Sequence, residues 1–385
     1  MTAEGEAQIG TKVYKTLVEA IADAQSGATV TLLKNASGAG IFLGVADAKE
    51  ITVDLGGFTY TCSGPAVGSS GTQTQAWHLE KNNTVAIKNG TLTSTSTAGV
   101  YMLVQNYCNL TLEDVTLDGT QLPGSKRYVL SNNCGNVNLT GNTSITAKSG
   151  DFAFDVCGYS SYTGVTVTVD TTGTITGNIE TSRSTNNTGI VKLVIKNGTF
   201  TNGGQAQQLI DIKGKDAEVI INGGSFVATW YCIVPWKDTK LTIEGGTFTV
   251  LEDGMVISGN GTDGKGNNTI INISGGTFNA GVPTSTDNTC CIYHPQAGVL
   301  NISGGSFNAE DGVGILMRGG ELNISGSASF TTAGTSVGKI ADAKSPKITS
   351  GYDVVIDKQC GYYDCENIVV SGTDNLKVDN FPKTE

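Results

Sequence analysis

Apolar and polar residues alternate in short stretches along most of this chain, and the stretches repeat. Residues 271–280 read INISGGTFNA, and residues 300–309 read LNISGGSFNA. In each copy Ile or Leu alternates with Asn or Ser, two glycines follow, and an apolar Phe comes next. Alternation with a period of two predicts a strand with one buried face, and the glycines predict a turn after it.

Stronger and weaker copies of this phrase recur 22 to 32 residues apart, measured between the apolar residues that close them. A period in this range, with strands and no helices in the repeat, is typical of a solenoid, whereas propeller blades need about 40–50 residues. We therefore predict an all-β parallel β-helix of about ten to twelve coils. The closing residues should form an interior column: Tyr60, Leu92, Leu117, Ile145, Ile175, Phe200, Phe226, Phe248, Phe278, Phe307 and Phe330.

The two ends of the chain differ from the repeats. Residues 1–35 combine a helical pattern over residues 16–25 with an apolar stretch at 29–34, and Thr16 with Glu19 forms a capping-box pattern. We expect this helix to cover the first coil of the β-helix, which we assign to residues 36–335. Residues 336–385 have strand composition without the phrase, which predicts a terminal capping module.

Composition narrows the functional classes. The formal net charge of −11 disfavours nucleic acid as a partner, and no apolar run is long enough to span a membrane. Nine cysteines, an odd number without tight spacing, predict reduced thiols in or beside strands. A loop disulfide between Cys360 and Cys365 is the alternative for that pair. With two histidines and no CxxC pair, we expect no metal site built from Cys and His.

The phrases ISGGTFNA and YHPQAGVLNISGGSF resemble right-handed parallel β-helix proteins of the pectate-lyase-like superfamily. They are most similar to SGGTF-repeat proteins, which occur as fibre components of phage virions and as surface proteins of gut Firmicutes. The resemblance covers roughly residues 10–335 and implies the fold. It does not imply one activity, because this body serves as pectinase, depolymerase tailspike, adhesin or plain fibre. The Gly-His-Gly and Arg-Ile-Lys phrases of the polygalacturonase-like members are missing.

One set of carboxylates forms a candidate catalytic site. Asp155, Glu180 and Asp211 each stand between apolar or small residues in the second strand of successive coils, so they should form an outward-facing ladder. Neighbouring coils lie about 5 Å apart, close to the carboxyl separation in a retaining glycosidase. The ladder could also bind a hard cation such as calcium. The alternative is a solvated polar face whose carboxylates stay ionised.

A second set of residues predicts a glycan-binding surface, because aromatic rings at a coil edge can stack on sugar rings. Its members lie in or near later copies of the second strand: Trp230, Tyr231, Trp236, Tyr293, His294 and Arg318. The alternative is that the two tryptophans close a loop over the core.

We expect a non-catalytic structural or adhesive protein, a phage virion fibre that presents a rigid surface to glycans or receptors on the host. Glu4 and Glu6, where a secretory signal would be basic, and the unpaired cysteines favour the virion. The alternatives are a polysaccharide-degrading glycosidase or lyase that uses the ladder, and an adhesin on the bacterial cell surface. Other virion or cell-surface proteins would be partners. The repeat suits a monomer and a homotrimer equally, and calcium is the one cofactor left open.

Overall fold

The computed structural model describes residues 5–203, 208–260, 268–281, 289–338, 347–358 and 367–381. Strands make up 56% of the chain and helix 2%, and the strands form a β-solenoid of about 12 turns. The predicted parallel β-helix is therefore confirmed. The chain divides into two compact units, Met1–Thr199 and Phe200–Glu385, which are described in turn. Among the described residues, no helix is long and apolar enough to cross a membrane.

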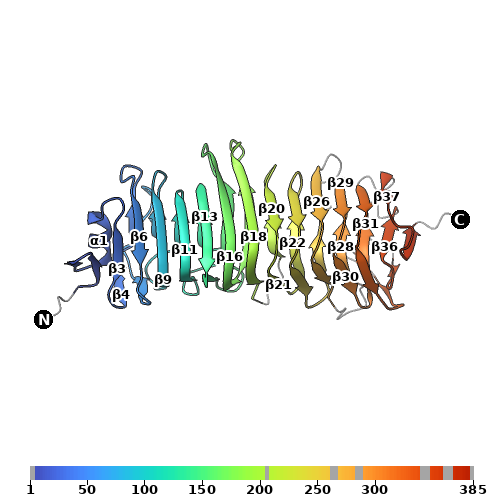
Figure 1. Ribbon diagram of the computed structural model, residues 1–385, viewed down its shortest axis with the longest axis horizontal. Coiled ribbons are helices and arrows are strands. Elements are labelled where there is room, and N and C mark those ends of the chain that lie inside the picture. The colour runs from blue at the N-terminus through green and yellow to red at the C-terminus, as the bar shows by residue number, and fades with distance from the viewer. Residues whose placement is uncertain are drawn as a thin grey trace. The chain divides into compact units, whose positions relative to one another are not determined.

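Two sheets make up most of unit 1, and both are parallel apart from the antiparallel pairings of the first strand of the chain (Figure 1). We call the sheet that carries the repeat phrase the repeat sheet and the other the second sheet. The strands of the repeat sheet are β1 (Ala7–Ile9), β2 (Lys12–Tyr14), β3 (Thr29–Leu32), β4 (Ala36–Gly38), β6 (Glu50–Asp54), β7 (Thr59–Cys62), β9 (Thr84–Ser94), β11 (Asn109–Asp118), β13 (Gly135–Gly141), β14 (Ser144–Thr146), β16 (Gly164–Thr176) and β18 (Ile190–Thr201), the last of which contains the unit boundary. The strands of the second sheet are β5 (Ile41–Leu43), β8 (Gln75–Leu79), β10 (Met102–Asn106), β12 (Tyr128–Asn132), β15 (Phe152–Gly158) and β17 (Asn178–Arg183).

The second sheet of unit 1 determines where the turns lie. Its strands are hydrogen-bonded in the order β5-β8-β10-β12-β15-β17, and each neighbouring pair is parallel. Because parallel strands end at the same edge of a sheet, the turns that follow β8, β10, β12 and β15 gather on one side of the unit.

Helix α1 (Leu17–Asp23) is the helix predicted over residues 16–25, and it lies against β3 at the N-terminal end of unit 1 (Figure 1). The Thr16 hydroxyl accepts the backbone N–H of Glu19 at 3.1 Å, which confirms the predicted N-cap. Leu17 and Ile21 are buried on one face of the helix. Its role as a cover for the first coil stays a prediction.

Unit 2 again has a repeat sheet and a second sheet. The strands of its repeat sheet are β20 (Glu218–Ile221), β21 (Ser225–Ala228), β23 (Lys240–Ile243), β24 (Thr247–Val250), β26 (Thr269–Ile273), β27 (Thr277–Asn279), β29 (Gly298–Ile302), β30 (Ser306–Ala309), β32 (Glu321–Ile324), β33 (Ser329–Thr332) and β37 (Val369–Ser371). The strands of the second sheet are β19 (Gln208–Ile212), β22 (Tyr231–Pro235), β25 (Met255–Ser258), β28 (Thr289–His294), β31 (Gly312–Met317), β36 (Val354–Asp357) and β38 (Val378–Phe381). A separate antiparallel pair comprises β34 (Val337–Gly338) and β35 (Ile348–Thr349).

The phenylalanines that close the repeat phrase form one interior column in unit 2, as predicted. Adjacent rings stack nearly parallel, with centroids 4.6 to 5.1 Å apart. The first five rings are fully buried, and Phe330 ends the column partly exposed. In order, the members are Phe200, Phe226, Phe248, Phe278, Phe307 and Phe330. From Phe226 on, each ring is the register partner of the next along the sheet, and Phe200 stacks on Phe226.

The two glycines of the phrase are needed because neighbouring coils lie too close together to leave room for a side chain. A Cβ atom on Gly275 would lie 2.3 Å from the carbonyl oxygen of Glu244, one coil earlier. Gly276 adopts φ +101°, a conformation that strains other residues. On the outer face beside this turn, the side-chain amide of Asn301 donates to Oδ1 of Asn272 at 2.9 Å, and that of Asn323 donates to Oδ1 of Asn301 at 3.1 Å.

The outer face of the second sheet in unit 2 is apolar and covered. Met255, Cys290, Val313 and Leu316 form a buried cluster with Ile348 of β35, so a segment that follows the last repeat packs over this face. Residues 354–357 and 378–381 then extend the second sheet as β36 and β38. The division of this region into a separate capping module stays a prediction, and Cys360 and Cys365 lie outside the described residues.

Candidate functional site

The predicted carboxylates lie on strands of the second sheet. In unit 1, Asp155 on β15 and Glu180 on β17 are register partners, so these two stand on adjacent coils. Asp211 lies on β19 of unit 2, where its register partner is Val234. In unit 1 the same column continues through one residue on each earlier strand of the sheet: Ser131, Gln105, His78 and Phe42.

Asp155 is buried, whereas the sequence predicted that it would face water. The residue is 6% exposed, and Ser131 and Asn132 of the preceding strand contact its carboxyl group. Oδ1 accepts the backbone N–H of Asn132 at 2.7 Å, and Oδ2 accepts the hydroxyl of Ser131 at 3.3 Å. Burial raises the pKa of Asp155 to about 7, with a further contribution from the charge of Glu180, and the two hydrogen bonds oppose this rise.

The other two carboxylates already have protein partners. Glu180 is half-buried and accepts the phenol hydroxyl of Tyr128 at 2.5 Å. Asp211, 4% exposed, accepts the side-chain amide of Gln208 at 3.0 Å, the indole N–H of Trp236 and the ammonium of Lys213. The prediction that Asp211 faces water is therefore also wrong.

No metal cluster emerges from these groups. Across the described ranges, no three His, Cys, Asp or Glu side chains lie close enough together to hold a metal ion. The calcium option raised by the acidic ladder therefore gains no support from Asp155 and Glu180, whose oxygens accept hydrogen bonds from N–H and O–H donors.

The predicted glycan-binding residues do not share one exposed surface. Trp230 is 38% exposed, and its indole N–H donates to Glu252 at 3.4 Å. Its ring meets Tyr231 edge-on, but Tyr231 packs against the buried apolar cluster of unit 2. Trp236 is held by Asp211.

The three remaining members of the set are buried. Tyr293 belongs to the apolar cluster under Ile348. The guanidinium of Arg318 is fully buried, where it pairs with Asp357 at 2.8 Å and lies 5.4 Å from the Tyr293 ring. His294 is also fully buried. The sequence placed His294 and Arg318 on an outer line, and the structure places both in the interior.

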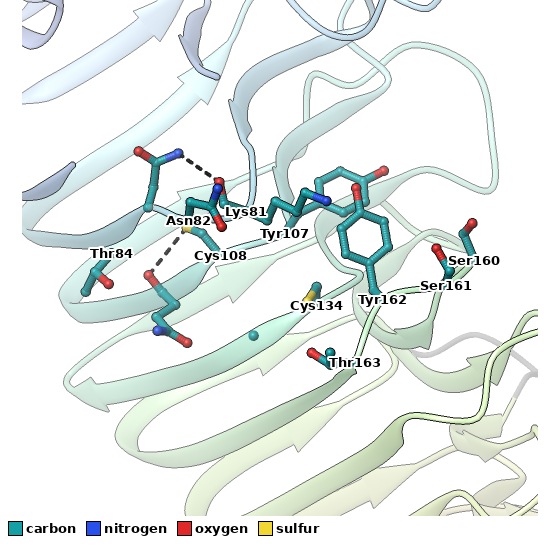
Figure 2. A pocket seen from close by; sticks show the side chains of 13 residues that line it. Lys81, Asn82, Thr84, Tyr107, Cys108, Cys134, Ser160, Ser161, Tyr162 and Thr163 are labelled. Carbon is teal, nitrogen blue, oxygen red and sulfur yellow. Dashed lines mark hydrogen bonds between the residues drawn. The ribbon is translucent and has the colours of Figure 1, made fainter. Parts of the chain in front are cut away.

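A different site, which the sequence did not predict, lies in unit 1 where the turns of the second sheet gather. It is an open cavity of about 640 Å³. Four successive turns supply its lining: Lys81, Asn82, Asn83 and Thr84 after β8; Tyr107, Cys108 and Asn109 after β10; Cys134 and Gly135 after β12; and Ser160, Ser161, Tyr162 and Thr163 after β15. Figure 2 shows the Lys81 side chain extending toward the ring of Tyr162.

Three tyrosine rings cluster at this cavity. The Tyr107 ring lies 5.1 Å from Tyr162 and 6.0 Å from Tyr159, measured between centroids. Its hydroxyl accepts the side-chain amide of Gln105 at 3.1 Å, and its ring lies 5.7 Å from the imidazole of His78. Burial raises the pKa of Tyr107 well above its usual range, so its hydroxyl stays protonated. Tyr107 is thus fixed by its neighbours, whereas Tyr159 is exposed.

The lining of the cavity is polar and carries one formal charge. Amide and hydroxyl side chains predominate, no carboxylate is among the lining residues, and Lys81 is the one cation. The Lys81 ammonium lies 5.5 Å from the centroid of the Tyr162 ring, within cation–π range. Such a lining offers aromatic faces together with many uncharged donors and acceptors.

The signal for this cavity was weak in the sequence because its residues lie in turns. The segments NYCN at 106–109 and GYSSYTG at 158–164 interrupt the strand alternation and do not belong to the repeat phrase. Three tyrosines in two turns, which lie two coils apart, were the only indication.

No family model, no curated protein and no solved structure matches this chain.

Proposed function

We propose that this protein binds a glycan in the tyrosine-lined cavity of unit 1 and acts as a non-catalytic attachment protein. The observation that carries the proposal is the cluster of Tyr107, Tyr159 and Tyr162 beside an open cavity lined with amides and hydroxyls. The repeat strands and their turns would hold this surface in place.

The chemistry of a sugar suits this lining. A pyranose ring has an apolar C–H face and a rim of hydroxyls, so it needs an aromatic surface and uncharged hydrogen-bonding groups around it. Tyr162 offers the aromatic surface. The uncharged hydrogen-bonding groups come from Asn82, Asn109 and Ser161. Because Tyr107 is already fixed by Gln105, little side-chain ordering opposes binding at that ring.

The test is a glycan array followed by titration of the best ligand. Tyr162→Ala should weaken binding by about 2- to 10-fold, the loss expected for about 0.5–1.5 kcal/mol of aromatic contact. Tyr101→Ala is the matched control, since Tyr101 is an exposed tyrosine of unit 1 that does not line the cavity. Equal affinity of the wild-type protein and Tyr162→Ala would contradict the proposal. Loss of binding on Trp230→Ala alone would move the site to unit 2.

A second candidate function is polysaccharide cleavage by Asp155 and Glu180. The observation in its favour is the pKa of Asp155, about 7, on a carboxyl that stands in register with a second carboxylate. A general acid needs such a pKa. Against it, both Asp155 oxygens are engaged by Asn132 and Ser131, and the group is nearly inaccessible. New reducing or unsaturated ends from capsular or cell-wall polysaccharides, abolished by Glu180→Gln, would establish cleavage.

For the biological setting we propose a fibre of a phage particle, with a bacterial cell-surface adhesin as the alternative. The repeat phrases support both settings through their resemblance to proteins of both kinds. The seven described cysteines are all free, which favours assembly in a reducing compartment. Mass spectrometry of purified particles and of cell envelopes from the same culture would decide between the two.

A further inference from the structure

Two cysteines on adjacent coils line the cavity of unit 1. Cys108 follows β10 and Cys134 follows β12, and both are free and nearly buried. The side-chain amide of Asn106 donates to the carbonyl oxygens of both, at 3.0 Å for Cys108 and 3.5 Å for Cys134. One buried amide therefore ties the two cysteine backbones together.

We propose that Cys108 and Cys134 form a redox-active pair, which closes to a disulfide between neighbouring coils on reaction with a low-molecular-weight disulfide such as glutathione disulfide. The proposal does not depend on glycan binding. It assigns a modification site to the lining of the cavity, and its ligand class is a small, polar disulfide that can enter an open cavity of about 640 Å³.

The backbone geometry suits a disulfide. Asn106 and Asn132 are register partners, and the N–H of Asn133 donates to the carbonyl of Asn106 at 2.8 Å. Cys108 and Cys134 follow these partners by two residues each, and the register shifts by one residue before the next pair, Leu110 and Val137. Their α-carbons should therefore lie about 5–6 Å apart, one coil step with a small offset along the strands. Disulfides span α-carbon separations of about 4.4–6.8 Å.

The thiol of Cys108 must turn to reach its partner. At present it donates to Oδ1 of Asn106 at 3.2 Å and to the carbonyl of Asn109 at 3.4 Å. Thiol hydrogen bonds are weak, and rotation about one side-chain bond breaks only these two. Figure 2 shows Cys108 and Cys134 on neighbouring turns of the cavity.

The order of the steps follows from the burial of the two thiols. Burial raises the pKa of Cys108 to about 12, and the neighbouring Cys134 adds to the rise. The thiolate is the nucleophile, and Cys134 should react first because it is the more exposed residue, at 9% against 3% for Cys108. It loses its proton to solvent, attacks one sulfur of glutathione disulfide and releases one glutathione thiolate. Cys108 then loses its proton, attacks the Cys134 sulfur and releases the second. Two protein thiols are oxidised, and one small disulfide is reduced to two thiols.

The experiment treats the full-length protein with glutathione disulfide and maps peptides by mass spectrometry without reduction. The expected product links the peptides of Cys108 and Cys134 and has lost two hydrogens, about 2 Da. The Cys108→Ser variant should stop at a stable mixed disulfide on Cys134, which also shows that the variant is folded and reactive. Closure in the wild-type protein should accelerate about tenfold per pH unit between pH 7 and pH 9, since the Cys108 thiolate fraction rises in that proportion.

Two results would overturn the proposal. One is a mixed disulfide on Cys134 that persists in the wild-type protein as it does in Cys108→Ser. The other is a link from Cys134 to Cys157, the half-exposed thiol on β15. The Cys157→Ser variant removes that competitor and should form the Cys108–Cys134 link at the wild-type rate.

Discussion

Asp155→Asn should stabilise the protein at alkaline pH and leave it nearly unchanged at acidic pH. The carboxyl is buried, and its pKa rises from 3.8 to about 7 on folding. The folded state therefore holds a proton that the unfolded state has lost between these two values. Stability from this group is complete below pH 3.8 and is lost as the pH rises through 7.

The magnitude follows from the two pKa values. At about 1.4 kcal/mol per pKa unit, the rise from 3.8 to about 7 corresponds to about 4 kcal/mol lost by pH 8 relative to acidic pH. Between pH 5 and pH 8 the loss is about 3 kcal/mol. Asn does not titrate, and its carbonyl can still accept the backbone N–H of Asn132. The difference in free energy of unfolding between Asp155→Asn and the wild-type protein should therefore grow by about 3 kcal/mol from pH 5 to pH 8.

Urea unfolding of both proteins at pH 5, 6, 7 and 8 measures this difference. Asp170→Asn is the control, because that carboxylate is half-exposed in the same unit. A difference that stays constant across the series would refute the reasoning, since it would mean that Asp155 has the same pKa folded and unfolded.

Three further predictions concern the core and the ends of the chain. Phe278→Ala should lower the free energy of unfolding by about 3–5 kcal/mol, because the ring is fully buried between two stacked rings; a loss below 1 kcal/mol in urea unfolding would contradict this. Burial lowers the pKa of His294 from 6.5 to about 4, so acidification from pH 6.5 to pH 4 should cost about 3 kcal/mol, and His294→Gln should remove this dependence from the melting curves. Deletion of residues 1–27 removes helix α1, which packs against β3 and buries Leu17 and Ile21. The deletion should cause aggregation, measured by light scattering. A soluble, equally stable deletion variant would show that helix α1 does not protect the end of the sheet.

Much of the fold could be predicted because one local pattern repeats. Each copy of the phrase places an apolar residue at the same point of its coil. The register of Phe248, Phe278 and Phe307 therefore follows from aligning the repeat sequences. The length differences between coils fall in turns, which leave the strands aligned. The helix at Leu17–Asp23 could be predicted from the sequence because it has its own N-cap residue and its own apolar face.

The candidate site could not be predicted with the same success, since burial on the outer face depends on distant segments. Asp155 and Asp211 alternate with apolar residues as exposed side chains would, yet neighbouring groups cover both. Tyr293 is buried in a cluster with Ile348, which follows the last repeat, and Arg318 pairs with Asp357 of β36. The tyrosine cavity depends on turns, where no repeat enforces a pattern.

The asparagine ladder of unit 2 has a chemical consequence for the sequence motif that contains it. Asn272, Asn301 and Asn323 each begin an Asn-Ile-Ser triplet, the acceptor motif for N-linked sugars, which are joined at the side-chain amide nitrogen. In the folded unit, that nitrogen in Asn301 and Asn323 donates to the previous rung. A sugar at either residue would break a rung and push against the next coil. The triplets at Asn301 and Asn323 are therefore by-products of strand stacking, and folding engages the nitrogen that a glycosylating enzyme would have to reach.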